Sequence, residues 1–471
     1  MLFSSLTFLF MFLPILLLLY FVNKNIKYRN CILLIFSLIF YSWGEPKYII
    51  LMLLTTFVVY VSGLIIEKNR NNIKSKLSLT ISIVICLLSL FIFKYLYFST
   101  HIINSIFSTR IKSFNLILPI GISFYTFQII TYIVDLYRGK VKLQRNPFKL
   151  LLYVSFFPQL IAGPIVRYET IEKEINTRKI TKDSFVQGFK RFLIGLSKKV
   201  IIANNVAILS DYIYNNNNLS SDVGTSLLWV AALAYSLQIY FDFSGYSDMA
   251  IGLGKMFGFN FLENFNYPYI ASSITDFWRR WHISLSTFFR DYVYIPLGGN
   301  KVKRIINIRN IIIVWILTGL WHGASFNYII WGIYYCIFLL IEKFVIGKKI
   351  KNIPRIVRHF ISLIIIVIGW VIFRLEDTSM LIQVLKGMFV FNKTDWLAIF
   401  KINTKLVTII PYLIIGIIFS LPIDTWLHKK VVNSKKIYLT LLEDFVLGVL
   451  FIIVVVKLVS NSYNPFIYFR F

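Results

Sequence analysis

The sequence predicts an all-α polytopic membrane protein. Hydrophobic residues make up 57% of its 471 residues, and the mean hydropathy is +0.71. Soluble domains contain only about 45–50% apolar residues, even when Gly is counted. Apolar runs long enough to cross a bilayer recur from one end of the chain to the other, and helices satisfy their own backbone hydrogen bonds in lipid. One helical bundle can hold the whole chain, so we expect a single membrane-embedded domain over residues 1–471.

Five spans are expected in the first third of the chain. The first lacks the charged start and the small-residue cleavage site of a secretory signal, so we interpret it as a retained span. The five spans are residues 3–22, 31–44, 47–66, 77–98 and 116–137. Lys and Arg cluster after the first, third and fifth spans. The positive-inside rule therefore assigns these loops to the cytoplasm and the N-terminus to the outside.

The middle of the chain is less regular. Two prolines and a glycine interrupt the apolar residues 150–166, which suits a re-entrant segment buried in protein. Residues 167–199 are polar and basic with a helical pattern, and we expect them in the cytoplasm. A span follows over residues 226–243. The amphipathic segment DFWRRWHISLSTFFRDYVYIPL, which starts at Asp276, is expected to lie along the membrane surface or to dip into it.

The last third of the chain is expected to begin with a hairpin. Residues 310–321 rise only about 18 Å at 1.5 Å per residue, against about 30 Å of hydrocarbon. Residues 326–346 then return to a basic loop, so His322 lies at the turn. Further spans are expected near residues 359–375, 406–426 and 440–460, followed by an extracytoplasmic tail, SYNPFIYFRF, over residues 462–471.

The net charge of +29 is explained by the loops. A basic balance of this size can indicate nucleic acid or anionic lipid. Because the Lys and Arg residues lie between the spans, we expect the lipid bilayer as a partner and no nucleic acid. The cysteines, Cys31, Cys86 and Cys336, are far apart and lack metal-ligand spacing. The sequence has no P-loop, GxSxG or HExxH motif, so no metal and no permanently bound cofactor are expected.

His322 is the first candidate for chemistry. It lies in the apolar run WILTGLWHGASFNYIIWG, where an ionisable group rarely occurs without a use. A neutral imidazole can take the proton of a hydroxyl group and so make it a better nucleophile. Between the two membrane faces, such a base could serve two substrates that approach from opposite sides. The alternative is a structural histidine that is hydrogen-bonded between helices.

His282 and the two arginines before it form the second candidate. Arg279 and Arg280 could bind the phosphates of a nucleotide-bearing donor, because a guanidinium group matches phosphate oxygens. The alternative is an interfacial helix whose Arg and Trp side chains bind lipid headgroups.

Four more polar residues were weighed as structural groups. Arg290 and Asp291 are expected to form a structural ion pair rather than a catalytic one. Asp242 and Asp248 flank Gly245, and we expect helix-end capping or polar packing from them.

The chain ends in an aromatic segment, FIYFRF, which includes Tyr468. Such a segment can serve as an interfacial anchor. A phenol can also act as a covalent carrier if a base activates it.

These segments resemble the membrane-bound O-acyltransferase (MBOAT) family, within its bacterial branch of alginate O-acetyltransferases and teichoic acid D-alanyltransferases. The resemblance spans nearly the whole chain, and two motifs carry most of it: DFWRRWHISLSTFFRDYVYIPLGG (276–299) and LTGLWHGASFNYIIWG (317–332). The first of these is more similar to the polysaccharide O-acetyltransferases than to the D-alanyl exporters. Further shared motifs are LPIGISFYTFQ (118–128), FFPQLIAGPIVR (156–167), FDFSGYSDMAIG (241–252) and FNYPY (265–269).

The resemblance implies a multi-helix bundle around a central funnel, with re-entrant and interfacial helices. It implies that His322 is the catalytic histidine and that His282 is the second histidine of the family. The terminal FIYFRF is similar to the FxYxxF motif that a small separate partner carries in the D-alanylation system. By this resemblance, Tyr468 could accept the acyl group and hand it to an extracytoplasmic partner.

We therefore expect a multi-pass acyltransferase of the bacterial inner (cytoplasmic) membrane. Acetyl-CoA is the expected donor, and His322 the base that acts on Tyr468 or on a sugar hydroxyl. The acetyl group would finally reach a cell-surface polysaccharide through an esterase-like extracytoplasmic transferase. Two alternatives stay open: D-alanyl transfer to teichoic acid from a carrier protein, and, in another class, a transporter or flippase for a lipid-linked sugar.

Overall fold

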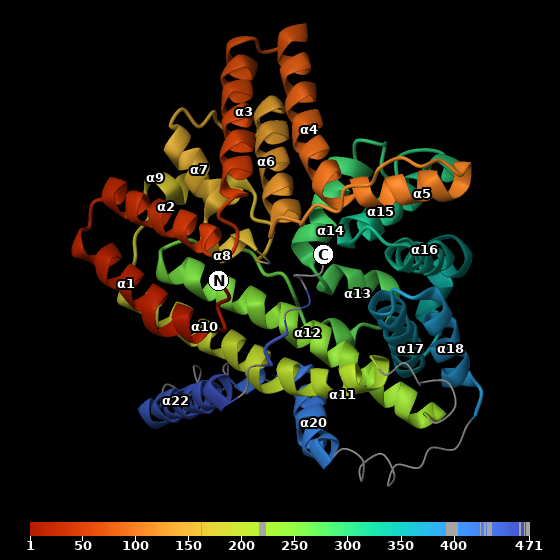
Figure 1. Ribbon diagram of the computed structural model, residues 1–471. Coiled ribbons are helices and arrows are strands. Elements are labelled where there is room, and N and C mark those ends of the chain that lie inside the picture. The colour runs from red at the N-terminus through yellow and green to blue at the C-terminus, as the bar shows by residue number, and fades with distance from the viewer. Residues whose placement is uncertain are drawn as a thin grey trace. The chain divides into compact units, whose positions relative to one another are not determined.

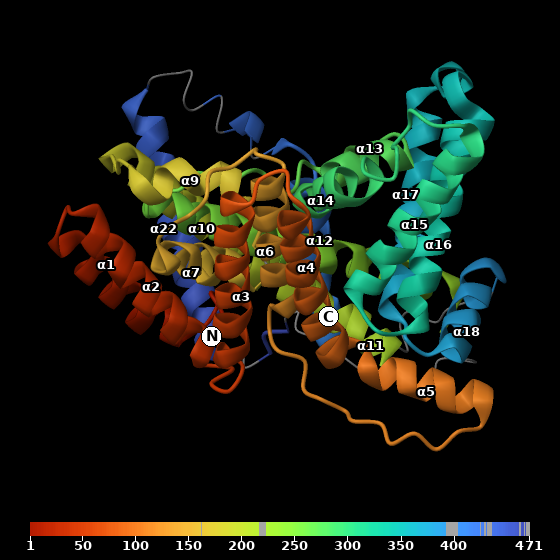
Figure 2. The same ribbon diagram turned by 90° about the horizontal axis from the view of Figure 1, so that it is seen from above.

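The protein is described by a computed structural model over residues 1–161, 163–215, 223–391, 404–423, 425–427, 430, 436–460, 463–465 and 467. These residues are mostly helical and contain no β-strand, which confirms the all-α prediction (Figure 1, Figure 2). Within them, eight helices are long and apolar enough to cross a bilayer. They are Ile49–Lys68, Ile73–Lys94, Lys182–Tyr214, Thr225–Met256, Arg304–His322, Phe326–Ile346, Arg355–Arg374 and Ile437–Ser460. The chain is a multi-pass membrane protein, as predicted.

The chain divides into two compact units. Unit 1 consists of Met1–Phe192 and Ser247–Leu262, and unit 2 consists of Leu193–Tyr246 and Glu263–Phe471. Helices α10 (Lys182–Ser197) and α12 (Thr225–Met256) contribute residues to both. The expectation of one membrane-embedded domain stays a prediction.

Unit 1 is built around three apolar helices. α3 (Ile49–Lys68), α4 (Ile73–Lys94) and α6 (Ile122–Tyr137) pack against one another and lie side by side in both views (Figure 1, Figure 2). α6 is buried along almost its whole length. The other elements are a π-helical turn (Phe8–Phe12), α1 (Leu13–Val22), α2 (Ile26–Ser42), α5 (Leu96–Phe107), α7 (Pro147–Ser155), α8 (Phe157–Leu160) and α9 (Tyr168–Asn176).

The apolar segment 150–166 is broken, as predicted. α7 ends at Ser155, and the four-residue helix α8 begins after a single intervening residue. The buried Tyr153 hydroxyl lies 3.0 Å from the carbonyl oxygen of Val166 and ties the two ends of the segment together. Buried side chains thus satisfy backbone groups that a continuous helix would satisfy itself.

Unit 2 has an aromatic core. The ring centroids of Trp278 and Trp331 are 5.4 Å apart, and those of Trp281 and Trp370 are 4.6 Å apart. Around these rings, α15 packs on α16 and α16 packs on α17, as Figure 1 shows. The elements are a π-helical turn (Lys198–Ala203), α11 (Asn204–Tyr214), α13 (Ile274–Arg280), α14 (Ile283–Phe289), a second π-helical turn (Arg290–Tyr294), α15 (Arg304–His322), α16 (Phe326–Leu340), α17 (Arg355–Arg374), α18 (Thr378–Phe389), α20 (Ile410–Phe419) and α22 (Ile437–Ser460).

Helix α15 is longer than the predicted climb over 310–321. It has 19 residues and rises about 28 Å at 1.5 Å per residue. Its first turns contain polar residues that suggested a loop, but these are buried. The Asn307 side chain donates to the carbonyl oxygen of Gly299 at 2.6 Å, and Asn310 donates to that of Leu297 at 3.0 Å. The asparagines therefore hold the preceding loop against the helix.

Residues 182–199 also differ from the expectation of a polar cytoplasmic segment. They form the start of a 33-residue helix, Lys182–Tyr214, that is apolar enough to cross a bilayer. Lys199 on this helix is buried beside Asp242 of α12, with 2.6 Å between Nζ and Oδ1. The sequence pattern counted such residues as solvated, because their charged partners lie far away in the chain.

Candidate functional site

The hairpin of α15 and α16 positions His322 at its turn, as predicted. α15 ends at His322, and α16 begins four residues later at Phe326. Two glycines let the helix backbones approach closely. A Cβ atom on Gly319 would lie 2.3 Å from the carbonyl oxygen of Tyr328, and one on Gly332 would lie 2.4 Å from that of Trp315. No larger residue fits at either position without moving the helices apart.

His322 is buried in an aromatic surround. Its side chain is 3% exposed. The ring centroids of Trp321, Trp331 and Phe373 lie 4.9, 5.0 and 5.1 Å from that of His322, each close to perpendicular. These packed rings fix the plane of the imidazole, which a base needs if it is to act on one particular proton.

His282 lies at a strained corner between α13 and α14. Its φ of +43° is in the left-handed region, and Tyr267 has a similar φ of +44°. Non-glycine residues of this size seldom adopt such angles, and strain of this kind often accompanies functional sites. Two main-chain hydrogen bonds hold the corner. The amide of Ile283 donates to the carbonyl of Asn264 at 2.9 Å, and that of Asn266 donates to the carbonyl of Arg280 at 2.9 Å.

Asn264 fixes the proton position on His282. The Oδ1 atom of Asn264 accepts hydrogen bonds from the amide of Ser284 at 3.1 Å and from its hydroxyl at 2.8 Å. Because an amide can only donate, this oxygen is an acceptor, and the Nδ1 atom of His282, 3.2 Å away, carries the proton it shares with it. The lone pair of His282 is then on Nε2, which is buried without a hydrogen-bond partner among the described residues. Burial lowers the pKa of His282 to about 3, so the imidazole is neutral at physiological pH.

Both histidines line one cavity of about 560 Å³ within unit 2. Its walls come from α13 to α16 and the turns between them. The lining residues are Ser273, Thr275, Trp278, Arg279, Trp281, His282, Leu285, Ser286, Phe289, Arg290, Tyr294, Ile311, Val314, Trp315, Thr318, His322, Leu339, Glu342, Lys343 and Ile350. The structure therefore brings together the two histidines that the sequence separates by 40 positions (322 − 282).

The two predicted phosphate-binding arginines have different surroundings. Arg279 lines the cavity, is exposed and forms no ion pair with any described residue. Arg280 is not a lining residue, and its Nε lies 2.9 Å from Asp276 Oδ1. Arg279 is thus the one of the two whose guanidinium is open to a ligand.

Two further cations line the cavity, and both have protein partners. Arg290 is paired with Asp291 at 2.7 Å, and this hydrogen bond raises the pKa of Arg290. Lys343 donates to Asn307 Oδ1 at 2.7 Å. The Arg290–Asp291 pair agrees with the structural role predicted for it.

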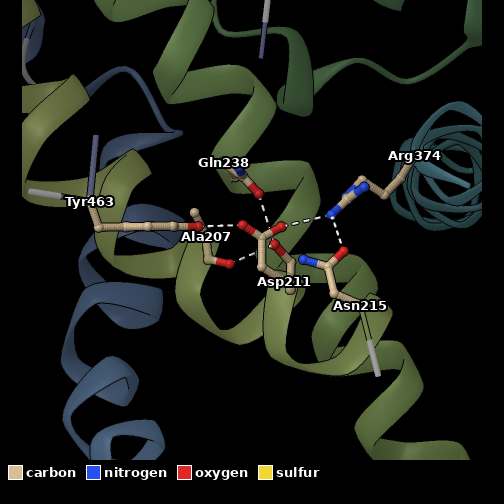
Figure 3. Close-up of polar contacts among 7 residues, drawn as sticks. Ala207, Asp211, Asn215, Gln238, Arg374 and Tyr463 are labelled. Atoms are coloured by element: carbon tan, nitrogen blue, oxygen red, sulfur yellow. Dashed lines mark hydrogen bonds and ion pairs between the residues drawn. The ribbon is translucent and has the colours of Figure 1, made fainter. Parts of the chain in front are cut away.

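The described part of the C-terminal tail packs into unit 2. Figure 3 shows Asp211 between Tyr463 of the tail and Arg374 of α17. The Asn204 side chain donates to that of Asn464 at 3.1 Å, and the buried Asp242 accepts from the amide of Ile467 at 2.9 Å. Tyr468, the predicted acyl carrier, lies outside the described residues.

Sequence reasoning missed the residues that support the site and the tail. Asn264 directly precedes the FNYPY motif, and an amide next to a motif is a weak signal. Lys199 gave a stronger one, because it is a lysine followed by the apolar residues VIIA. Asp242 and Asp248 lie inside α12 and pair with Lys199 and Arg191, so they pack as polar partners and do not cap a helix end.

The fold and the cavity define a multi-pass membrane protein with a buried, histidine-lined site, and comparisons with known proteins agree. A family model described as MBOAT, membrane-bound O-acyltransferase family, matches residues 143–373, which include every lining residue of the cavity. The chain is 37% identical to the probable alginate O-acetylase of Pseudomonas aeruginosa over the whole of both chains. It is 37% identical to the peptidoglycan O-acetyltransferase of Helicobacter pylori, with 83% of this chain and 80% of that protein covered.

A more distant similarity connects the chain to D-alanyl transfer. It is 34% identical to the teichoic acid D-alanyltransferase of Bacillus subtilis over 51% of this chain and 63% of that protein. Taken together, these similarities show that the chain belongs to the membrane-bound O-acyltransferase family and is an acyltransferase.

Proposed function

We propose that this protein transfers an acetyl group from a cytoplasmic thioester donor to a hydroxyl group, for the O-acetylation of a cell-surface polysaccharide. Acetyl-CoA is the proposed donor, His322 the general base and His282 a second catalytic histidine. The observation that carries the proposal is the cavity of about 560 Å³ that both histidines line. A general base must reach the proton it removes, and a cavity beside two buried imidazoles gives a hydroxyl group a place to bind.

The proposed chemistry is acyl transfer between a thioester and an alcohol. Nε2 or Nδ1 of His322 takes the hydroxyl proton while the oxygen attacks the thioester carbonyl carbon. The tetrahedral intermediate collapses, the C–S bond breaks, and the thiolate leaves as the thiol after taking the proton from the imidazolium. His282 is close by and carries its lone pair on Nε2, so it can accept a hydrogen bond from the donor or the acceptor. Arg279 is the proposed contact for a donor phosphate.

Acetyl transfer is favoured over D-alanyl transfer by the extent of the similarities. Relatives named for O-acetylation align over 83% to 100% of this chain, whereas the D-alanyltransferase of Bacillus subtilis aligns over 51%. The names of the O-acetylating relatives suggest alginate or peptidoglycan as acceptors, and both are polysaccharide-based. Family membership favours an enzyme over the flippase alternative.

The proposed route ends outside the inner membrane. Tyr468 would receive the acetyl group as an ester and pass it to an esterase-like extracytoplasmic partner, which would transfer it to the polysaccharide. Support comes from the aromatic tail motif and from the seat of residues 463–467 in unit 2.

The test is His322→Gln in a strain whose only copy of this gene carries the change, with the membrane level of the protein measured. Glutamine keeps hydrogen-bonding atoms but cannot act as a base at neutral pH. We expect polysaccharide O-acetylation to fall by about a hundredfold or more, in the range for loss of a general base. Unchanged acetylation at normal protein level would exclude His322 as the base.

A second experiment identifies the donor. Purified protein in proteoliposomes is given acetyl-CoA labelled in its acetyl group, and the label on protein and acceptor is counted. The proposal predicts labelled ester that hydroxylamine removes. Tyr468→Phe should lose the label on the protein, while label retained in that variant would rule out the tail as carrier.

A further inference from the structure

A buried ion pair contacts the backbone of the C-terminal tail. Lys199 and Asp242 are each 2% exposed, and Nζ lies 2.6 Å from Oδ1. The second carboxylate oxygen of Asp242 accepts from the amide of Ile467 at 2.9 Å, and Lys199 Nζ donates to the carbonyl oxygen of Pro465. One partner of the pair therefore holds a main-chain donor of the tail, and the other holds a main-chain acceptor two residues earlier.

The local packing explains how this pair can form. Gly245 lies three residues after Asp242 on α12, and a Cβ atom there would be 2.7 Å from the carbonyl oxygen of Gly195 and 3.2 Å from the amide of Lys199. Because Gly245 has no side chain, α12 comes close enough for Asp242 to reach Lys199. The buried charges gain further hydrogen bonds only from the tail backbone among the contacts described above.

The pair is costly unless the tail is present. Removing two charges from water is repaid only when good geometry and extra hydrogen bonds satisfy the remaining lone pair and protons. The amide of Ile467 and the carbonyl of Pro465 supply such bonds. Charged residues inside membrane-spanning helices are also rare without a function.

Side chains of the tail add three more attachments to unit 2. The Tyr463 hydroxyl donates to Asp211, and Asn464 accepts from Asn204. The Ile467 side chain, 8% exposed, joins the hydrophobic core of the unit. Asp211 is itself held by Arg374 at 2.8 Å, as Figure 3 shows. Every described residue from Tyr463 to Ile467 thus has a contact with this unit.

We propose that Lys199 and Asp242 form a clamp on the tail backbone and are positioning residues for acyl transfer through Tyr468, the residue covalently attached to Ile467. The inference rests on the carrier role proposed above. The clamp binds a C=O and an N–H group, so it fixes the path of the main chain and leaves the side chains of the tail free to serve other purposes.

The first test removes one hydrogen bond of the clamp and leaves the ion pair in place. Ile467→Pro has no N–H group for Asp242, whereas the matched control Ile467→Val keeps it and stays apolar. Tail seating is measured by cross-linking cysteines placed at positions 204 and 464 with a short bifunctional thiol reagent, after Cys31, Cys86 and Cys336 have been replaced. We expect Ile467→Pro to lower cross-linking and acetyl transfer by roughly tenfold or more, as loss of a hydrogen bond to a charged group allows. Ile467→Val should change neither by more than about twofold.

A second variant removes the clamp without leaving an unpaired charge. Lys199→Met combined with Asp242→Leu replaces the pair by apolar residues, an exchange that is often neutral for stability. We expect a folded protein, shown by size-exclusion chromatography and thermal unfolding, with reduced cross-linking and reduced transfer. Unchanged cross-linking in both this variant and Ile467→Pro would overturn the clamp.

The carrier role is tested separately in the same assay. Tyr468→Phe should abolish transfer with cross-linking intact. If transfer survives in Tyr468→Phe, the carrier proposal fails, while the cross-link still reports on the clamp. If the tail is released by Ile467→Pro and transfer is unchanged, the positioning role of Lys199 and Asp242 fails.

Discussion

At the scale of single residues, the site depends on an amide that does no chemistry itself. The Oδ1 atom of Asn264 accepts from the amide and the hydroxyl of Ser284 and from Nδ1 of His282. These contacts select one tautomer and one ring orientation of His282, in the way that outer partners orient metal-binding and catalytic histidines. If Asn264 were lost, the imidazole could rotate or move its proton to Nε2.

Asn264→Ala should therefore impair catalysis more than substrate binding. We expect kcat to fall by about tenfold to a hundredfold, in the range for loss of an orienting partner, with the KM for the donor little changed. Asn264→Asp keeps an acceptor for Nδ1–H and should recover part of the activity. Steady-state kinetics with purified protein measures both. Equal activity of the alanine and aspartate variants would contradict the orienting role.

The buried, neutral His282 also predicts a pH dependence of stability. Its pKa is about 3 in the folded protein and about 6.5 in an unfolded chain. Between these values only the unfolded state binds the proton, so the free energy of unfolding falls as the pH drops below about 6.5, and the full stability is present above it. Thermal unfolding in detergent at about pH 7.5 and about pH 5 should show this loss in the wild type. His282→Asn, which tolerates a positive φ and does not titrate there, should show a smaller loss. An equal loss in both proteins would assign the effect to other groups.

At the scale of elements, the α15–α16 hairpin sets the depth and direction of His322. Gly319 and Gly332 lie where the two helices touch, each against a carbonyl oxygen of the opposite helix. In a lipid-embedded bundle, close backbone contact of this kind replaces the hydrophobic driving force between helices. The position of His322 is therefore determined by residues up to ten positions away from it.

Gly332→Ala should separate these helices. Its Cβ atom would lie 2.4 Å from the carbonyl oxygen of Trp315, so the backbones must move. We expect a loss of about 1–3 kcal/mol in the free energy of unfolding, as for other overpacked sites, together with reduced acetyl transfer. Gly448→Ala on α22 is the matched control, because nothing lies within 4 Å of its Cβ position. That change should be neutral or stabilising by up to about 1 kcal/mol. A Gly332→Ala protein as stable and active as the Gly448→Ala protein would refute the packing argument.

The elements also show how far the sequence could predict the structure. The hairpin with His322 at its turn followed from apolar periodicity and from the basic loops, which are local signals. Residues 182–199 were assigned to the cytoplasm because Arg191 and Lys199 counted as solvated charges. Their partners Asp248 and Asp242 are 57 and 43 residues away in the chain. No local pattern contains such pairs, and for the same reason the contact of Asn264 with His282 could not be foreseen.

At the scale of the whole molecule, the direction of acyl transfer depends on which loops face the cytoplasm. Eight described helices are long and apolar enough to cross the bilayer, and α6 is not one of them. With 16 residues, α6 rises about 24 Å, less than the hydrocarbon thickness. However, α6 is almost entirely buried by protein. A helix enclosed by its neighbours does not have to match the lipid, so α6 can complete a crossing together with the irregular residues before it.

The crossing by α6 therefore decides the topology of unit 1 and is the point to test. Ser113 precedes α6 and Lys140 follows it, and both are exposed. Single cysteines at these positions, in a protein without Cys31, Cys86 and Cys336, are treated in spheroplasts with a membrane-impermeant thiol reagent. The loop charges predict that Ser113→Cys reacts in intact spheroplasts and that Lys140→Cys reacts only after permeabilisation. Labelling of both from the same side would mean that α6 does not cross. The basic loop after it would then lie on the opposite face from the one that the charge pattern assigns.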